Sequence, residues 1–184
     1  MRIVEFFAKI CTCIIFNKKL RHHYRDFIKS RIYGWKIFKT AKFIGKNLYV
    51  GDFSTVNCNT EIGNFVNFNG MQIHGNGKVK IGNYFHSGVE CLIIAQNHNY
   101  EGELIPYDKT YIYKDIVIDD FVWIGSRVML LPGTHIGEGA IIQGGAVVHG
   151  EIPPFAIAGG NPAKVFKYRN KEHFLKLKNE GKYN

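Results

Sequence analysis

At 184 residues, the chain fits a single domain of ordinary size, and its 46% hydrophobic content is that of a folded protein, not a disordered one. The net charge of +9 is unevenly spread: residues 1–50 carry twelve Lys and Arg against two acids, residues 51–160 carry five against eleven, and residues 161–184 carry seven against two. A mildly acidic middle argues against a nucleic-acid-binding body, because the basic surface of such a body belongs to its folded core. Basic ends suit contact with phosphates or with an anionic membrane surface.

Residues 1–40 are predicted to form a basic, amphipathic helical segment. Ile3, Phe7, Ile10 and Ile14 share one helical face. Charged residues interrupt the apolar run, which is short for a membrane span, and no signal-peptide cleavage site follows it. Two interpretations stay open: the helix packs on the body or on a neighbouring subunit, or it lies on an anionic membrane surface.

The chain has four cysteines, and no two of them form a CxxC pair. We expect all four to be reduced and buried, as small hydrophobic side chains. This use of cysteine fits a cytoplasmic protein. The four residues are Cys11, Cys13, Cys58 and Cys91.

A branched aliphatic residue recurs at every sixth position from residue 118 to residue 148. Helices repeat near 3.6 residues and strands near 2, so the period belongs to something larger than one element. Hexapeptide repeats are typical of a β-helix, in which three repeats close one triangular coil and the aliphatic side chains stack inside. The series consists of Ile118, Ile124, Leu130, Ile136, Ile142 and Val148.

The same period appears earlier, from Ile44 to Phe68, and resumes at Ile81 after a slip near Gly75–Gly77. A second break falls between the two arrays, at residues 96–115. We therefore predict a mainly β fold: a β-helix domain over residues 41–167 with an inserted loop at 96–115. A short helical tail follows over residues 168–184. Packing of this helix against the coils stays open, but its apolar stripe is narrow, so we expect a solvated, partly frayed end.

Two short motifs are specific for one protein family: Val122-Trp123-Ile124-Gly125 and Gly159-Gly160-Asn161-Pro162-Ala163-Lys164. Through these motifs, residues 44–168 resemble the hexapeptide-repeat acyltransferases, in their maltose/galactoside O-acetyltransferase-like branch. The resemblance implies a left-handed parallel β-helix. It also implies a homotrimer with active sites between subunits, and acetyl-CoA as the acyl donor.

The inserted loop holds the candidate catalytic residue. In the family that the chain resembles, the catalytic His lies where the chain leaves the coil before this loop, and His98 occupies that place. A His whose ordinary pKa is about 6.5 can accept the proton of a sugar hydroxyl as that hydroxyl attacks a thioester. The resemblance implies a sugar-binding Asn near Asn69. Asn97 and Tyr100 flank His98 and are further candidates for holding acceptor hydroxyls.

The donor needs a narrow groove with small residues for its pantetheine arm and cations for its phosphates. The resemblance places Trp123 beside the thiol end, and two turns of small residues along the channel. It places the phosphate contacts on Lys164 and Lys167. Where many members of the family have Thr-Lys-Asp, this chain has His149-Gly150-Glu151, and His149 is the candidate contact for the nucleotide. The small residues are Gly125, Ser126, Gly144 and Gly145.

A spacing of twelve links His74, His86 and His98 and raises the question of a metal site. Two hexapeptides place successive members of this series on different faces of a three-sided coil. A catalytic zinc site needs three protein ligands in one place. We therefore expect no metal.

We interpret the sequence as that of a cytoplasmic, acetyl-CoA-dependent O-acetyltransferase acting on a sugar of surface-polysaccharide synthesis, with His98 as general base. Contact with the inner face of the membrane through the N-terminal helix remains open, and nucleic acid is not an expected partner. One alternative is N-acetylation of a nucleotide-linked amino sugar, or acetylation of serine. An alternative of another class is a non-catalytic, trimeric β-helix scaffold.

Overall fold

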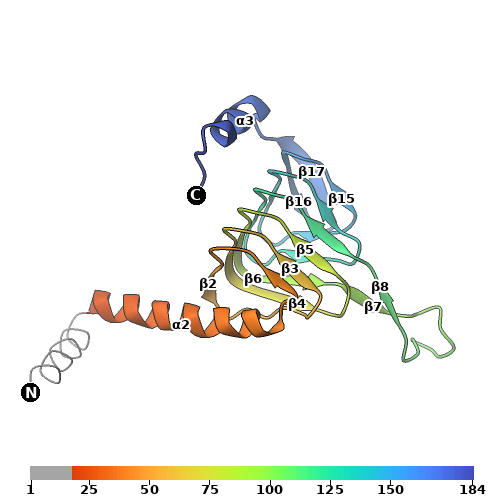
Figure 1. The fold of residues 1–184 in the computed structure, drawn as a ribbon. Coiled ribbons are helices and arrows are strands. Elements are labelled where there is room, and N and C mark those ends of the chain that lie inside the picture. Colours follow the sequence, from red (N-terminus) through yellow and green to blue (C-terminus); the bar gives the residue numbers. More distant parts are fainter. Residues whose placement is uncertain (1–17) are drawn as a thin grey trace, which may run out of the picture.

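A computed structural model describes residues 18–184 (Figure 1), so the predicted apolar stripe from Ile3 to Ile14, and Cys11 and Cys13, lie outside the described residues. The body is a stack of triangular coils. Helix α2 (Lys18–Thr40) lies across the N-terminal end of the stack, and helix α3 (Lys171–Asn179) lies near the opposite end. Among residues 18–184, no helix is long and apolar enough to cross a membrane.

One side of the stack is a six-stranded parallel sheet. Each coil contributes one short strand to it, and each strand pairs with the equivalent strands of the coils before and after. The strands, in spatial order, are β1 (Phe43–Ile44), β3 (Thr60–Ile62), β5 (Val79–Ile81), β9 (Ile116–Ile118), β12 (His135–Ile136) and β15 (Glu151–Ile152).

The second sheet covers the other two sides of the triangle, because β4 and β6 are long strands that bend round a corner. One part of β6 pairs with β10 and a later part pairs with β11. The only antiparallel pair in this sheet joins its last two strands. The strands are β2 (Tyr49–Asp52), β4 (Asn67–His74), β6 (His86–Ile94), β10 (Trp123–Ile124), β11 (Met129–Leu130), β13 (Ile141–Ile142), β14 (Val147–Val148), β16 (Ala156–Gly160) and β17 (Ala163–Tyr168).

The six-residue period is the step from one side of the triangle to the next, as predicted, and three steps lead from Ile118 to its in-register partner Ile136. All six aliphatic residues of the 118–148 series are at most 1% exposed. Ile62, Ile81, Ile118 and Ile136 pair in register from coil to coil and form one continuous inner column. Because every coil buries its side chains against its neighbours, the stack stabilises itself only as a whole. The prediction of a left-handed parallel β-helix is confirmed.

The slip in the early array lies at the predicted place. Inward-pointing Ile73 and Val79 are six positions apart, whereas the equivalent Leu130 and Thr134 are four apart, so the turn at residues 74–78 is the longer one. Asn57 fills the inside of this turn: its Nδ2 donates to the carbonyl oxygens of Gly75 at 2.7 Å and Gly77 at 3.0 Å.

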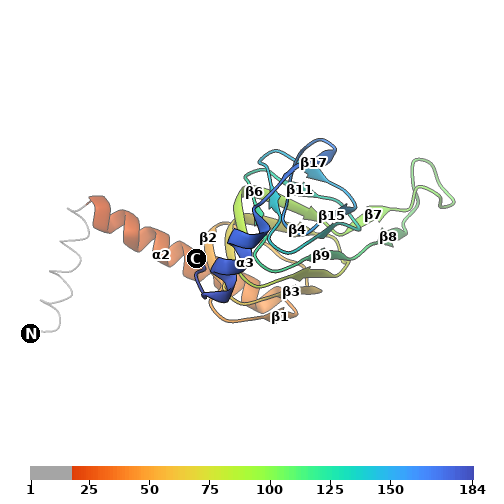
Figure 2. The same ribbon diagram turned by 90° about the horizontal axis from the view of Figure 1, so that it is seen from above.

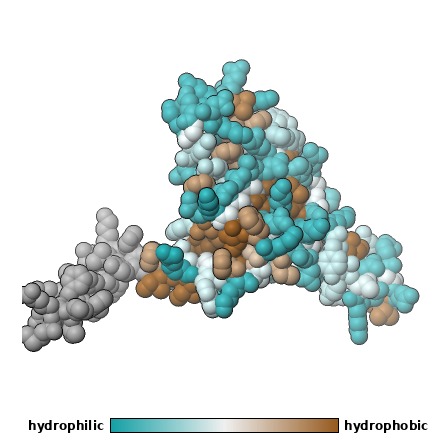
Figure 3. Space-filling view, viewed as in Figure 1, coloured by the Kyte–Doolittle hydropathy of each residue, from teal (hydrophilic) through white to brown (hydrophobic). Residues whose placement is uncertain are grey.

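Helix α2 caps the first coil through one side only. Ile37 is 1% exposed, and Tyr33 packs edge-on against Phe53 with ring centroids 5.8 Å apart. The other side of the helix leaves apolar side chains in solvent, and brown surface shows at this end of the molecule in Figure 3. These exposed side chains are Phe27, Ile28, Ile32, Trp35 and Phe38.

Two expectations about packing are wrong. The C-terminal helix is not simply solvated: Phe174 is 7% exposed and packs edge-on between Phe121 and Phe155. The sequence hides this contact because both partners come from turns, whose side-chain directions have no periodicity. Of the two described cysteines, Cys91 is buried but Cys58 is exposed, because Cys58 lies in the turn between two coils.

Candidate functional site

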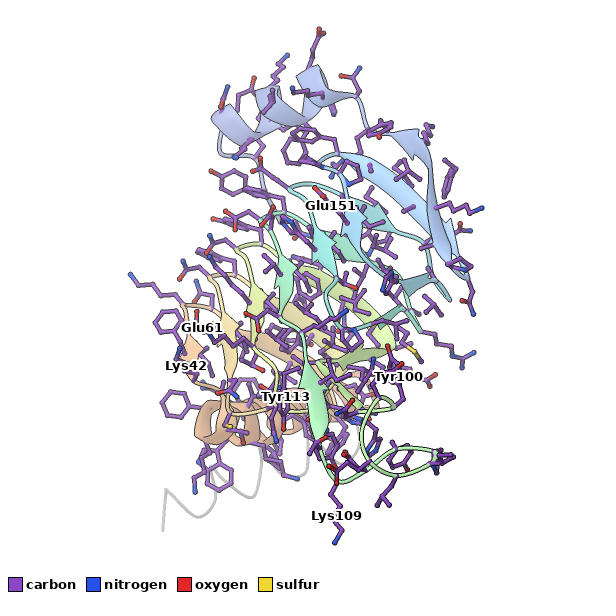
Figure 4. The ribbon with its side chains drawn as sticks, turned by 90° about the vertical axis from the view of Figure 1, so that its right-hand side faces the viewer. Lys42, Glu61, Tyr100, Lys109, Tyr113 and Glu151 are labelled. Carbon is purple, nitrogen blue, oxygen red and sulfur yellow. The ribbon has the colours of Figure 1, made fainter. Side chains whose placement is uncertain are left out.

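The inserted loop folds as a hairpin that leaves the stack after Ala95. Its two strands, β7 (Gln96–His98) and β8 (Tyr111–Tyr113), pair antiparallel, and His98 lies opposite Tyr111. Gln96 fixes the root, because its Oε1 accepts the N–H of Asn76 in the preceding coil at 2.9 Å. Figure 4 shows Tyr100, Lys109 and Tyr113 on this projecting hairpin, at the N-terminal part of the stack, with Glu151 near the other end.

The imidazole of His98 is held by stacking but remains exposed. Its centroid lies 3.8 Å from that of Tyr107 at an interplanar angle of 17°, and 4.8 Å from that of Tyr111. Neither ring nitrogen makes a hydrogen bond to any side chain or backbone group that the structure describes over residues 27, 28 and 30–184. Stacking therefore orients the ring plane while its edge stays open to an incoming hydroxyl, which is what a general base requires.

Asp108 holds the far part of the hairpin in shape. Its Oδ1 accepts the N–H of Thr110 at 2.8 Å, and its Oδ2 accepts the N–H of Glu103 at 3.2 Å. The hydrogen bond from the Thr110 hydroxyl, together with these N–H donors, lowers the pKa of the Asp108 carboxyl. The loop that carries Tyr107 is thus ordered by its own polar groups. Asn97 is exposed beside His98, and Tyr100 is 66% exposed.

Four of the predicted donor contacts meet at one corner of the stack, which we call the glycine corner: Gly125, Ser126, Gly144 and Gly145. A Cβ at Gly125 would lie 2.5 Å from the N of Gly144, so the two coils touch through bare backbone. The N–H of Gly145 donates to the carbonyl of Ser126 at 2.8 Å. A Cβ at Gly145 would have no neighbour within 4 Å, so this backbone borders open space.

Trp123 lies beside the glycine corner, on an outward-facing row of side chains. In register, this row runs through the adjacent strands as Asn67, His86, Trp123, Ile141 and Ile157. We call it the tryptophan row. Trp123 is 54% exposed, so its ring is available to a ligand.

The two predicted phosphate contacts extend these surfaces. Lys167 pairs with Ile157 and so continues the tryptophan row, and Lys164 pairs with Gly159 next to the glycine corner. Both lysines are exposed. His149 does not join them. It follows β14 and lies at the next corner of the triangle, one strand away from the glycine corner.

Asn69 is occupied within the stack. Its Nδ2 donates to the carbonyl of Ser87 at 2.9 Å, and its backbone N–H donates to the Ser87 hydroxyl at 3.2 Å. Asn67, two positions earlier, has a buried Oδ1 with no hydrogen-bond partner among the described residues. A buried acceptor without a donor costs free energy unless a ligand or water supplies one.

Asn67 is therefore a candidate acceptor contact that the sequence reasoning missed. The signal was available: the residue before each inward position of this strand points outward, and Asn67 precedes buried Phe68 just as Trp123 precedes buried Ile124.

One chain does not bring His98 to the tryptophan row. The hairpin leaves the stack between β6 and β9, at the corner that closes the six-stranded sheet, whereas Trp123 lies on another side of the triangle. Seen along the stack in Figure 2, the hairpin projects away from the side on which the C-terminal tail lies. The candidate base and the candidate donor surface are thus separate within one chain.

Comparison with known proteins explains the period. The family model described as bacterial transferase hexapeptide (six repeats) matches residues 115–150. The chain is a hexapeptide-repeat protein. It is 26% identical to the putative lipopolysaccharide biosynthesis O-acetyl transferase WbbJ of Escherichia coli K12 over 178 residues, which cover 80% of this chain and 87% of the relative.

Two further comparisons bear on the hexapeptide-repeat body. A chloramphenicol acetyltransferase of Escherichia coli is 44% identical over 63 residues, which are 34% of this chain and 30% of that enzyme, so the chain spans under a third of this relative's length. The solved structure of a galactoside acetyltransferase in complex with coenzyme A is 25% identical, with a TM-score of 0.55, covering 72% of this chain and 67% of that one.

The remaining histidines of this hexapeptide-repeat protein are dispersed. Nε2 of His135 lies 3.1 Å from Oδ2 of Asp119 on the six-stranded side, and His86 belongs to the tryptophan row. Among the side chains that the structure describes, those of residues 27, 28 and 30–184, no three His, Cys, Asp or Glu come together as a metal site would require.

Proposed function

We propose that this hexapeptide-repeat protein is an acetyl-CoA-dependent O-acetyltransferase that acts on a sugar hydroxyl of a surface-polysaccharide precursor. The observation that carries the proposal is the exposed imidazole of His98, oriented by Tyr107 and Tyr111 with its edge open. The relatives named as O-acetyltransferases support the reaction class.

His98 is the proposed general base. Acetyl-CoA would supply a thioester carbonyl as the electrophile. His98 accepts the proton of the sugar hydroxyl as that oxygen forms its bond to the acyl carbon, and returns the proton to the thiolate released when the carbon–sulfur bond breaks. The transfer is direct and needs no acyl-enzyme. Orientation of both substrates in one cleft supplies much of the rate.

The donor would bind along the glycine corner and the tryptophan row. Bare backbone at Gly144 and Gly145 suits a narrow pantetheine arm, and Ser126 presents a hydroxyl beside it. Lys164 and Lys167 would meet the phosphates, because they are the cations at the end of this surface. His149 remains a weaker candidate for the nucleotide, since it belongs to the next corner.

Asn67, Asn97 and Tyr100 are the proposed acceptor contacts. The buried Oδ1 of Asn67 lacks a donor among the described residues, and a sugar hydroxyl would supply one. Asn97 and Tyr100 flank His98 on the hairpin and are exposed. Asn69 is a poorer candidate than its position in the sequence indicated, because Ser87 already satisfies its amide N–H.

A homotrimer would complete the site. Because His98 and Trp123 lie on different sides of one chain, the hairpin of one subunit must reach the tryptophan row of another for both to act on the same substrates. Half-buried Leu92, Met129 and Val147 line the third side of the triangle in register and suit such an interface. Sedimentation equilibrium at micromolar protein tests this: a monomer would contradict it.

The protein would work on the cytoplasmic side of a membrane, with α2 against the inner face. Exposed Trp35 and Phe38 lie among basic residues of the helix, as in helices that lie in an anionic interface. The exposed free thiol of Cys58 is consistent with a reducing compartment.

Calorimetry with acetyl-CoA, together with thiol release in the presence of a panel of sugars, tests the reaction. We expect wild type and His98→Ala to bind acetyl-CoA equally and only wild type to turn over, whereas His173→Ala, an exposed His on α3, behaves as wild type. Turnover with amino sugars or serine alone would show that the acceptor is an amine-bearing sugar or serine and not a sugar hydroxyl. Absence of donor binding would favour the non-catalytic scaffold.

A further inference from the structure

A groove of about 480 Å³ separates the C-terminal segment from the coils, and the proposed function uses only its tryptophan-row wall. One wall is the tryptophan row at His86, Trp123 and Ile141. The other wall is α3 and the tail that follows it, which hangs beside the coils in Figure 1. The volume lies in the range of small-molecule sites, about 300–1,000 Å³. The groove is thus continuous with the surface where acetyl transfer would occur.

A column of aromatic rings forms the floor of the groove. Tyr84 stacks between Phe65 and Phe121, with ring centroids 4.9 Å apart and planes 2° apart on both sides. Tyr183 of the tail lies over Tyr84 at 4.6 Å, and Phe174 of α3 packs edge-on against Phe121 at 5.9 Å. These contacts fix the tail to the coils and give the groove a defined shape.

Cations line the side of the groove that the C-terminal segment supplies. Arg169 is half-buried: one of its nitrogens donates to the carbonyl of Gly139 at 3.1 Å, and its guanidinium lies 4.8 Å above the ring of Phe174. Lys178 and Lys182 also line the groove, and each pairs with a Glu, Glu138 and Glu180 respectively. The remaining N–H groups of a guanidinium fixed in this way are suited to a phosphate.

The cations at this groove contrast with the mildly acidic body of the chain. Residues 51–160 carry eleven acids against five cations, yet the segment 161–184 brings three of its seven cations, Arg169, Lys178 and Lys182, to this groove. Simple sugars are neutral and would gain nothing from this arrangement. A sugar carried on a diphosphate would match it, because its charge would meet the C-terminal cations while its sugar lay beside the donor at the tryptophan row.

We propose that this groove binds the diphosphate of an activated sugar acceptor, with Arg169 as the principal contact and Lys178 and Lys182 as supporting ones. The inference rests on the proposed function for the reaction itself but concerns a separate set of residues. The diphosphate could be joined to a nucleoside or to an isoprenoid lipid. The aromatic floor would contact either group.

Calorimetry of the full chain saturated with CoA tests this binding with three probes: inorganic pyrophosphate, UDP and farnesyl diphosphate. CoA is present because it also contains a diphosphate, so its own site could accept the probes. Saturation with CoA keeps the probes off the donor surface. We expect Arg169→Met and Lys182→Met each to weaken probe binding about tenfold and to leave the dissociation constant of CoA unchanged. Lys176→Met, an exposed residue of α3 outside the groove, is the matched control.

The outcomes separate clearly. Tighter binding of UDP than of pyrophosphate assigns a nucleotide source, tighter binding of farnesyl diphosphate assigns a lipid source, and equal binding of all three assigns recognition to the diphosphate alone. Loss of probe binding in the presence of CoA, or an equal loss of CoA affinity in the variants, would overturn the proposal. Lys182→Met keeps the test valid if Arg169→Met fails to fold. Probe binding without any acetyl transfer would leave the groove standing while the proposed reaction failed.

Discussion

The rings of His98 and Tyr107 stack with centroids 3.8 Å apart, although nine positions separate them along the hairpin. Such a pair orients the imidazole more firmly than an exposed side chain would be oriented alone, since aromatic stacking contributes about 0.5–1.5 kcal/mol beyond burial. The position of the proposed general base thus depends on the fold of the hairpin tip.

Replacement of Tyr107 should therefore change the rate without changing donor binding. We expect Tyr107→Ala to lower kcat about tenfold, as the imidazole loses its fixed orientation, and Tyr107→Phe to stay within about twofold because the ring remains. Thiol release under saturating acetyl-CoA gives kcat, and calorimetry gives the donor's dissociation constant. Equal rates for the Ala and Phe variants would show that stacking does not position His98.

The contact between coils at the glycine corner predicts a stability loss that depends on position. Gly125→Ala should destabilise the protein by about 2 kcal/mol or more, because its Cβ would lie 2.5 Å from the backbone N of Gly144. Gly150→Ala is the control: its φ of +78° disfavours a side chain, but a Cβ there has no neighbour within 4 Å. We expect it to cost about 1 kcal/mol.

Urea unfolding followed by circular dichroism measures both variants at one protein concentration. The donor's dissociation constant should rise only for Gly125→Ala, since the shifted backbone borders the proposed channel. If the two variants lose the same stability, the coils are not in tight contact at Gly125.

How far the sequence could predict this structure depends on whether side-chain direction was periodic. The column of Ile62, Ile81, Ile118 and Ile136 could be predicted because each member lies on the six-residue period of its own stretch of repeats, on either side of the slip and the inserted loop. The same rule also identifies the outward row that contains Asn67 and Trp123, because each of these residues comes one position before an inward residue. Asn69 is the candidate that the family resemblance implies, and the resemblance does not distinguish it from Asn67.

Other features lay beyond any local pattern. The stacking of His98 on Tyr107 depends on a non-repetitive hairpin, and the burial of Phe174 depends on rings from turns far away in the sequence. The predicted site likewise has a part that the repeats determine and a part that they do not. Gly125, Ser126, Gly144 and Gly145 meet because repeats bring equivalent turns together, whereas His98 remains apart because its loop is an insertion.

The hydrogen bonds at Asp108 predict an acid-dependent opening of the hairpin tip. Because the folded pKa of this carboxyl lies below its ordinary value, about 3.9, the ionised form contributes stability that is fully present above that value. This contribution is lost as the pH falls through the folded pKa. Hydrogen exchange of a peptide covering residues 99–110, compared at pH 7 and pH 3, should show less protection at pH 3.

Asp108→Asn provides the control for the intrinsic effect of pH on exchange. The variant should be less protected than wild type at pH 7, because a neutral acceptor holds the N–H groups of Thr110 and Glu103 more weakly. The difference between the two proteins should be smaller at pH 3 than at pH 7. A constant difference between them at both pH values would contradict the role of the Asp108 charge.

The exposed side of α2 predicts binding to anionic membranes. Trp35 and Phe38 are 56% and 74% exposed, and Nζ of Lys39 lies 3.9 Å from the centroid of the Trp35 ring. Burying one such ring in the interface would contribute about 1.5 kcal/mol or more, which is about tenfold in partitioning. We expect Phe38→Ser to reduce partition into liposomes containing phosphatidylserine by at least this factor, and salt to reduce it further.

Phe166→Ser is the matched control for the membrane experiment, because Phe166 is 61% exposed but lies on β17, near the other end of the stack from α2. Its partition should equal that of wild type. Equal loss in both variants would indicate general adsorption of apolar side chains, and no loss in Phe38→Ser would assign the exposed side of α2 to packing against a neighbouring subunit. Sedimentation of Phe38→Ser tests packing against a neighbouring subunit. In that case the oligomer of the variant would dissociate at a higher protein concentration than the wild-type oligomer.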